Sequence, residues 1–162
     1  MIEKKIITTF YETDFNSLNS QEKDLVNHAK VSMNSAYAPY SGFLVGATIL
    51  LENGEIISGN NQENVAYPSG LCAERVAIFY AGSQFPDVKM KTIAITAIFK
   101  KFEIKDVISP CGSCRQAIAE YEVKQEENIR ILLHHPDNSV LILNSISDLL
   151  PFMFKSKGLK NY

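Results

Sequence analysis

Residues 128–135 (NIRILLHH) and 139–145 (SVLILNS) decide the architecture expected for this chain. Both segments are rich in apolar and β-branched residues, as strands are, and only Pro136-Asp137-Asn138 separates them. Two parallel strands need a crossover of a dozen or more residues, usually a helix. Because this connection is far too short for one, the sequence predicts an antiparallel pair.

A second hairpin is predicted earlier in the chain. The apolar segments FLVGATILL and EIISGNN flank an Asn53-Gly54 dipeptide. That dipeptide is the strongest short-range signal of a hairpin. Antiparallel strands are therefore expected at about 43–51 and 55–60.

The other periodic segments predict helices and one strand that is covered on both faces. They are a helix from Ser20, a possible N-cap, that Pro39 stops; a helix beginning at or beside Cys72; the strand KTIAITAIF at 91–99; a helix in CRQAIAEYEV at 114–123; and a short last helix, SDLLPFMF, capped by Ser147. The order α, β, β, α, β, α, β, β, α indicates a three-layer α/β/α sandwich with a mixed five-stranded sheet.

The segment before Ser20 is expected to differ from the rest. Residues 1–19 are polar enough for a loosely attached arm, while KKIITTFYE within them could equally add an edge strand. The predicted organisation is therefore an N-terminal arm at 1–19 and one domain at 20–162.

Composition excludes several classes of function. The 162 residues suit one ordinary domain. A net charge of −2 without a dense Lys/Arg run gives no footprint for nucleic acid or an anionic membrane. No apolar run is long enough to cross a bilayer, and the N-terminus lacks the features of a secretory signal. We therefore expect a cytoplasmic protein with neither nucleic acid nor membrane as its partner.

Three cysteines form the candidate chemical centre: Cys72, and the pair Cys111 and Cys114 in SPCGSCRQ. An odd number in a reducing compartment makes a disulfide framework the poorest interpretation. A Cys-x-x-Cys at a helix start suits a redox pair or a metal clamp equally. Three thiolates match a catalytic zinc site, which leaves its fourth position to water. A closed structural site would need one more ligand, for which the candidates are His28, His134 and His135.

Glu74 favours the metal. It follows Cys72 by two residues, close enough to face water at a metal without being a ligand. One carboxylate can take a proton from that water and return one to a leaving group. Arg75 could donate hydrogen bonds to the sulfurs and offset their negative charge. Arg115 offers the same role, although an exposed helix arginine is the plainer interpretation.

At this point the motifs resemble a known family. CAERVA followed by SPCGSCRQAIAEYE resembles the zinc-dependent deaminase signature in its three-cysteine form. AYAPYSGFLVGA, NNQENVAYPSGLCAER, SPCGSCRQ and LLPFMF occur in the order found in short, homotetrameric cytidine deaminases. The match runs from about Ala36 to Phe154.

The resemblance implies a hydrolase that converts cytidine and 2′-deoxycytidine to uridine and 2′-deoxyuridine in pyrimidine salvage. One Zn²⁺ per subunit would be held by Cys72, Cys111 and Cys114. Hydroxide on the zinc would attack C4 of the base, with Glu74 as the proton shuttle. A homotetramer with active sites at its subunit interfaces is also implied.

The resemblance further implies a set of substrate contacts. Taken alone, these residues are typical of core packing, solvated turns or helix starts. In the family, an aromatic ring packs on the pyrimidine, an Asn and a Glu bind the ribose, backbone groups read the base, and a C-terminal aromatic reaches a neighbouring subunit. The corresponding residues are Phe43; Asn61 and Glu63; Ala73 and Ser109; and Phe154.

Three other functions stay open. A polynucleotide-editing deaminase would need a helix between the last two strands, which Pro136-Asp137-Asn138 leaves no room for. A deaminase for a nucleoside analogue shares the zinc motif, but the intact YSGFLVGA and NNQEN favour ordinary cytidine. A non-catalytic zinc module has no need of the carboxylate of Glu74.

Overall fold

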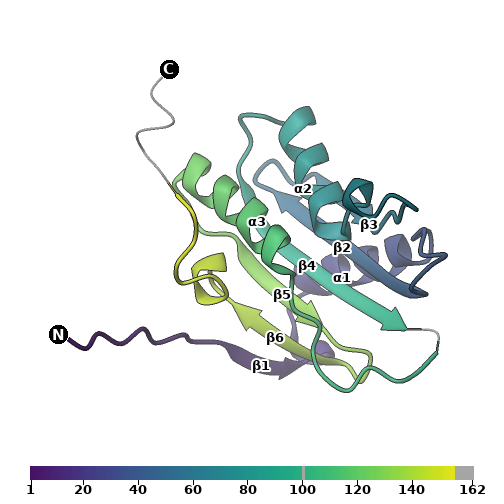
Figure 1. Ribbon diagram of the computed structural model, residues 1–162, viewed down its shortest axis with the longest axis horizontal. Coiled ribbons are helices and arrows are strands. Elements are labelled where there is room, and N and C mark those ends of the chain that lie inside the picture. Colours follow the sequence, from purple (N-terminus) through teal and green to yellow (C-terminus); the bar gives the residue numbers. More distant parts are fainter. Residues whose placement is uncertain (100, 156–162) are drawn as a thin grey trace.

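A mixed sheet of six strands forms the centre of the molecule (Figure 1). The computed structural model describes residues 1–99 and 101–155. The sheet order is β1-β6-β5-β4-β2-β3, and only β4 and β5 run parallel among the paired strands of the described residues. The strands are β1 (Tyr11–Asp14), β2 (Phe43–Leu51), β3 (Ile56–Asn60), β4 (Met90–Phe99), β5 (Arg130–His134) and β6 (Ser139–Leu143).

Both predicted hairpins are present. β5 and β6 pair antiparallel, and Asn138 in their connection adopts a φ of 74°, a left-handed conformation that Asn tolerates. In the β2–β3 turn Gly54 has a φ of 89°. Asn138 and Gly54 each adopt the positive φ angle of a tight turn. The two short turn sequences could therefore predict the antiparallel pairs β2–β3 and β5–β6.

The prediction of five strands was wrong, because Tyr11–Asp14 adds a sixth. β1 pairs antiparallel with β6 at the edge of the sheet. Of the segment KKIITTFYE, which was expected as a possible edge strand, only Tyr11 and Glu12 belong to β1, and residues 4–10 are not part of a strand. β1 is mostly exposed and has no alternating apolar pattern; its place comes from backbone pairing with β6. Leu18 is also buried, in the cluster formed with α1. The division into an arm at 1–19 and a domain at 20–162 stays a prediction, and residues 100 and 156–162 of that domain lie outside the described residues.

Helices cover both faces of the sheet, as a three-layer sandwich requires (Figure 1). α1 (Ser20–Met33) packs on one face, and α2 (Ala73–Gln84) and α3 (Gly112–Gln125) lie on the other. Asn19, rather than Ser20, is the N-cap of α1: its side chain accepts from the amide of Glu22, whose carboxylate accepts from the Asn19 amide. No helix among the described residues is both long and apolar enough to span a membrane.

Two glycines let the helices lie directly on the strands. A Cβ on Gly46 of β2 would come within 2.0 Å of the Ala29 carbonyl oxygen in α1. A Cβ on Gly59 of β3 would come within 2.6 Å of the Ala77 amide nitrogen in α2. Because neither backbone atom can move aside cheaply, these contacts fix where α1 and α2 cross the sheet.

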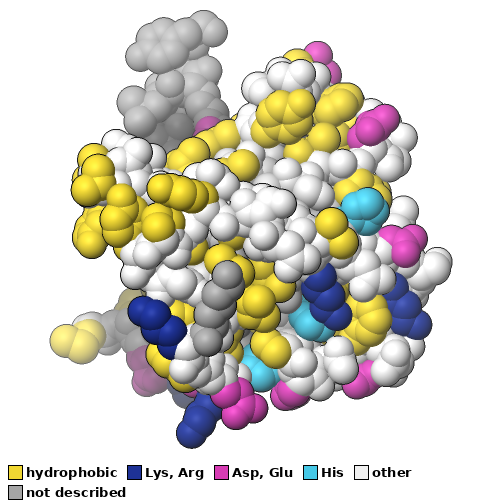
Figure 2. Space-filling model, turned by 90° about the vertical axis from the view of Figure 1, so that its right-hand side faces the viewer, with side chains coloured by type: hydrophobic (Ala, Val, Ile, Leu, Met, Phe, Trp, Pro, Cys, Tyr) yellow, Lys and Arg dark blue, Asp and Glu magenta, His cyan; other side chains and the backbone are white. Residues whose placement is uncertain are grey.

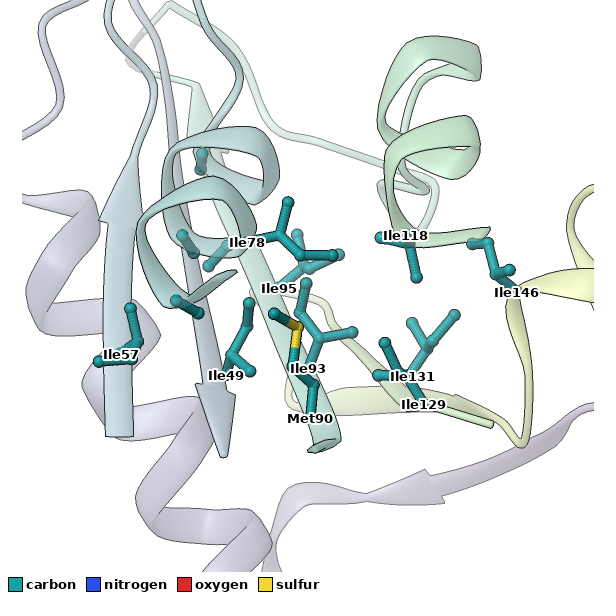
Figure 3. Packing of buried hydrophobic residues seen from close by; sticks show 14 of the residues in the cluster. Ile49, Ile57, Ile78, Met90, Ile93, Ile95, Ile118, Ile129, Ile131 and Ile146 are labelled. Carbon is teal, nitrogen blue, oxygen red and sulfur yellow. The ribbon is translucent and has the colours of Figure 1, made fainter. Parts of the chain in front are cut away.

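The larger core lies between the sheet and the pair α2 and α3. In Figure 3, Ile78 of α2 and Ile118 of α3 lie above Ile93 and Ile95 of β4. All four side chains are buried, and each contributes on the order of 1.5–3 kcal/mol relative to an exposed position. This core holds the N-terminal ends of α2 and α3 beside each other.

The last predicted helix is a single 3₁₀ turn, η3 (Ile146–Asp148). Its N-cap is Ser145, whose hydroxyl accepts from the Ser147 amide, so the cap lies two residues before the predicted one. Pro151 disfavours a helical conformation at the residue before it and has no amide hydrogen. The segment therefore leaves the helical path after one turn.

His134 makes the fold sensitive to acid. It is buried between β4 and the N-terminal segment, where its Nδ1 lies 2.9 Å from Thr96 Oγ1 and its ring meets Phe15 edge-on. Burial, followed by the positive charge of Lys30, lowers the pKa of His134 to about 4. Between that value and an unfolded pKa of about 6.5, the unfolded state binds a proton that the native state does not. Stability is therefore expected to fall as the pH drops through this window, by up to about 1.4 kcal/mol per pH unit.

Urea unfolding at pH 7, 6, 5 and 4 checks this expectation. His134→Gln should remove this part of the slope, whereas His28→Gln, on the exposed side of α1, should keep it. The difference between variant and wild type isolates the histidine from every other acid-sensitive group. Equal slopes in all three proteins would contradict the expectation.

Candidate functional site

The first turns of α2 and α3 bring the three cysteines together. Cys72 is the N-cap of α2, Cys111 is the N-cap of α3, and Cys114 lies in the first turn of α3. The Sγ atom of Cys111 lies 3.9 Å from that of Cys72 and 3.5 Å from that of Cys114. The sulfurs all lie within 4.8 Å of one another, although 39 residues separate Cys72 from Cys111 in the chain.

The donor set fits zinc. A tetrahedral ion with bonds of about 2.3 Å holds its sulfur ligands about 3.8 Å apart, close to the spacings found here. Among the described residues no fourth Cys, His, Asp or Glu joins this cluster. The two buried histidines are engaged elsewhere, His134 with Thr96 and His135 with the carbonyl oxygen of Ile104. Three protein ligands leave one position for water, which is the pattern of a catalytic rather than a closed structural site.

Electrostatics in the cluster favour a thiolate at Cys72. The pKa of Cys72 is lowered to about 5, first by a hydrogen bond from the Cys114 thiol and then by the Arg75 guanidinium, against the opposing effect of burial. Arg75 Nη2 lies 3.8 Å from Cys72 Sγ. The pKa of Cys114 is raised because it donates to Cys72 and is buried. The positive N-terminal ends of α2 and α3 add to the stabilisation of negative charge on the sulfurs.

Glu74 lies in the first turn of α2 and is buried, with 5% of its surface exposed. Burial raises its pKa, while hydrogen bonds from its own amide and from the Cys114 thiol partly oppose that shift. It also lines the cavity next to Cys72. A buried carboxyl with a raised pKa, beside a metal-binding cluster, is suited to exchanging protons with a bound molecule.

An open cavity of about 670 Å³ adjoins the cluster. That volume is in the range of sites for small organic molecules. Its walls include one aromatic ring from β2, side chains from the segment after β3, and the segment before α3. Among the predicted site residues, those that line it are Phe43, Asn61, Glu63, Cys72, Glu74, Arg75, Ser109 and Cys111.

Two of the predicted substrate residues are not on the wall. Ala73 is buried at the start of α2, between Cys72 and Glu74, and does not line the cavity. Phe154 is 74% exposed and lies outside the cavity. Its amide donates to Gln116 Oε1, and its carbonyl oxygen accepts from Gln116 Nε2. The C-terminal segment is thereby held with the Phe154 ring in solvent.

Asn61 and Glu63 are already engaged within the chain. The Asn61 side chain accepts from the Val45 amide and donates to the Phe43 carbonyl oxygen. Glu63 accepts from the amides of Tyr40 and Ser41 and from the Ser41 hydroxyl. Burial opposes ionisation of Glu63, but these hydrogen bonds together lower its pKa. The two side chains therefore fix the entry to β2 and the position of the Phe43 ring.

Arg115 does not contact a sulfur, contrary to the role first considered for it. Its guanidinium donates to the Pro110 carbonyl oxygen at 2.7 Å, the Leu149 carbonyl oxygen at 2.8 Å and Ser109 Oγ at 2.9 Å. It thus ties the cavity wall before α3 to the segment after η3. Among the two candidate arginines, only Arg75 reaches the cluster.

Sequence reasoning missed several residues of the cavity wall. Tyr40 and Tyr67 both line it, and their rings meet edge-on. Leu71 and Ile108 complete an apolar part of the same wall. These residues lie in loops and in a single 3₁₀ turn, where hydrophobic periodicity gives no indication. The position of Tyr40, three residues before Phe43, could have pointed to it.

Comparison with known proteins finds zinc-binding deaminases that are similar to this chain in sequence and fold. The family described as the cytidine and deoxycytidylate deaminase zinc-binding region matches residues 19–126. The chain is 31% identical over 137 residues to a cytidine deaminase of Halalkalibacterium halodurans, an alignment that covers 85% of this chain and 96% of that one. It is 43% identical over 97 residues to the cytidine deaminase of Sporosarcina psychrophila, with 60% and 67% covered. The crystal structure of the Burkholderia pseudomallei cytidine deaminase superposes with a TM-score of 0.70 at 33% identity, covering 82% of this chain and 98% of that one.

Proposed function

The chain belongs to the zinc-dependent cytidine deaminases, and from that premise we propose that it hydrolyses both cytidine and 2′-deoxycytidine. Water replaces the 4-amino group of the base: a bond forms between C4 and oxygen, the bond from C4 to the amino nitrogen breaks, and ammonia leaves. The observation that carries the proposal is the buried carboxyl of Glu74 at the wall of a nucleoside-sized cavity, beside three clustered thiols.

Cys72, Cys111 and Cys114 would hold the zinc, which when bound supplies Lewis-acid activation of water. Glu74 would take a proton from the attacking water and deliver protons to N3 and the departing amino group. Burial suits this role because a raised pKa brings the carboxyl closer to its working range. The positive charge of Arg75 and the N-terminal ends of α2 and α3 would offset part of the negative charge of the three thiolates.

The nucleoside is proposed to lie with its base toward the cluster. The Phe43 ring would pack on the pyrimidine, and the Ser109 carbonyl and Ala73 amide would bind its polar edge. Asn61 and Glu63 would bind the ribose while they hold the entry to β2. Contacts made through the 3′-hydroxyl would not discriminate between ribose and deoxyribose, which is why we propose both substrates.

We propose that the enzyme is a homotetramer of the cytoplasm, working in pyrimidine salvage. Exposed apolar residues support an assembly: Phe79 and Tyr80 on α2 are exposed, and so are Phe152 and Phe154. Figure 2 shows hydrophobic side chains gathered in patches on one face of the molecule. The Lys and Arg side chains on this face are scattered and form no cluster. Patches of this kind mark interfaces more often than solvent-facing surface. Phe154 would reach the cavity of a neighbouring subunit.

A substrate panel tests the proposal. Purified zinc-loaded protein is incubated with cytidine, 2′-deoxycytidine, cytosine, CMP and a cytosine-containing single-stranded DNA, and ammonia release is followed. We expect turnover of both nucleosides and little or none of the other three. Turnover of neither nucleoside would overturn the function, and preferred turnover of CMP or DNA would move the enzyme to another substrate class.

Arg115 provides a further test of how the cavity wall is held. Arg115→Gln is expected to raise KM for cytidine about tenfold, with kcat and zinc content near wild type, because the Ser109 segment loses its anchor. Arg115→Lys keeps the charge but cannot make three directed bonds, so it should behave similarly. Steady-state kinetics with metal analysis gives the result. A fall in kcat together with loss of zinc would instead attribute the effect to the cysteine cluster.

A further inference from the structure

The N-terminal segment continues the free edge of the sheet. β1 ends the strand order, so among the described residues only β6 lies beside it. Residues 1–10 run on from β1 in an extended path beyond the body of the molecule (Figure 1). Thr8 Oγ1 donates to the Asp148 carbonyl oxygen, which ties this path to η3. An open strand edge is a template for pairing with another strand.

This segment carries apolar side chains that the chain itself does not cover. Ile7 is 87% exposed, Phe10 57% and Ile6 55%. Lys4 and Glu12 have no ion-pair partner among residues 1–99 and 101–155. A strand with apolar side chains on both sides of its centre and opposite charges toward its two ends is complementary to a second, antiparallel copy of itself.

We propose that residues 2–14 of two copies of this chain pair antiparallel about a two-fold axis at Thr8. The two six-stranded sheets then join edge to edge into one sheet of twelve strands, six from each copy. Residues 2–5 of each copy cover the open edge of β1 in the other. This contact lies at β1, at the opposite edge of the sheet from β3, and does not depend on the proposed function.

Symmetry limits the register. A two-fold axis between antiparallel strands of one sheet is perpendicular to that sheet, so every side chain keeps its face. Residues opposite each other must share a face, and side chains alternate along a strand. The two residue numbers in a facing pair must therefore add up to an even number. If about residues 2–14 of each copy take part in the pairing, the two residue numbers of a facing pair can add up to 14, 16 or 18.

Over residues 4–12, only the sum of 16 brings both the opposite charges of Lys4 and Glu12 and the apolar side chains of Ile6 and Phe10 into facing positions. It places Lys4 opposite Glu12 twice and Ile6 opposite Phe10 twice, on the same face. A sum of 14 would place Lys4 opposite Phe10, and a sum of 18 would place Ile6 opposite Glu12. A sum of 18 also needs Asp14 as the partner of Lys4, but the Asp14 side chain already accepts from the Asn16 amide. Opposite charges and apolar pairs facing each other stabilise antiparallel strands.

Disulfide trapping in the full, zinc-loaded chain tests the register. In the proposed pairing Thr8 faces its own copy with Cα atoms about 4.5–5.5 Å apart, which a disulfide can span. Thr8→Cys should therefore give a covalent dimer on mild oxidation. Thr9→Cys is the matched control, because its two copies would lie about 8 Å apart, too far for a disulfide. The wild-type protein, oxidised in the same way, shows how much cross-linking the three native cysteines give by themselves.

Charge reversal then tests the partner contacts. In the Thr8→Cys background, Lys4→Glu alone and Glu12→Lys alone should each slow cross-linking about tenfold, because like charges then face each other. The double reversal restores opposite charges and should restore the rate. Cross-linking that is equal at positions 8 and 9, absent at both, or indifferent to the reversals would overturn the proposal.

Discussion

Replacing Glu74 with Gln is expected to lower kcat for cytidine at least about 10²–10⁴-fold, with the zinc content unchanged. The amide has nearly the same shape and is not a metal ligand, so the three thiols should still bind the ion. It can neither accept a proton from water nor return one to the amino group. Because 5% of the Glu74 surface is exposed, no bulk water can readily replace this shuttle.

The measurement is steady-state ammonia release with metal analysis of the same samples. Glu55→Gln, at an exposed position in the β2–β3 turn, is the control for a neutralised glutamate and should keep wild-type kcat. A Glu74→Gln enzyme that retains zinc and full kcat would contradict the proton-shuttle role. Loss of zinc in this variant would instead show that the carboxyl supports the cluster itself.

The parts of the fold that the sequence predicted depend on local patterns. Asn53-Gly54 and Pro136-Asp137-Asn138 each dictate a short turn, and a short turn leaves only an antiparallel partner. The convergence of the cysteines was likewise accessible, because Cys72 and Cys111 each lie at the start of a helix that follows a strand or loop. In such sheets the helix starts gather at one end.

The features that the sequence did not predict depend on contacts between distant residues. β1 has no pattern of its own and pairs with residues more than 120 positions away in the chain. Arg115 donates to the carbonyl oxygen of Leu149, 34 residues later in the chain, and not to a sulfur. This contact forms because the segment after η3 passes beside the start of α3. The double role of Asn61 likewise depends on how β2 and β3 meet. Each of these outcomes needs the assembled fold.

Glu122 is the clearest residue of this second kind. In the sequence it is one more glutamate in the polar helix segment EYEVKQEE. In the structure it is buried on the inner side of α3. Its Oε1 accepts from the amides of Ile129 and Ile146, and its Oε2 accepts from the Ser145 hydroxyl. One side chain thus fixes α3 to the segment before β5 and to the start of η3.

Glu122→Ala is therefore expected to destabilise the protein by about 3 kcal/mol or more. The change leaves the Ile129 and Ile146 amides buried without an acceptor, at about 1–3 kcal/mol each, while the Ser145 hydroxyl can keep Ser147 as its partner. Glu122→Gln keeps one carbonyl oxygen that can accept from both amides, and its new NH2 group can donate to the Ser145 hydroxyl. It should therefore cost clearly less than the alanine change, which keeps the test informative if the alanine variant does not fold. Glu55→Ala, at an exposed position in the β2–β3 turn, is the control for loss of a glutamate side chain. Urea unfolding at one protein concentration compares the three, and an alanine variant within about 1 kcal/mol of the control would show that Glu122 does not anchor these segments.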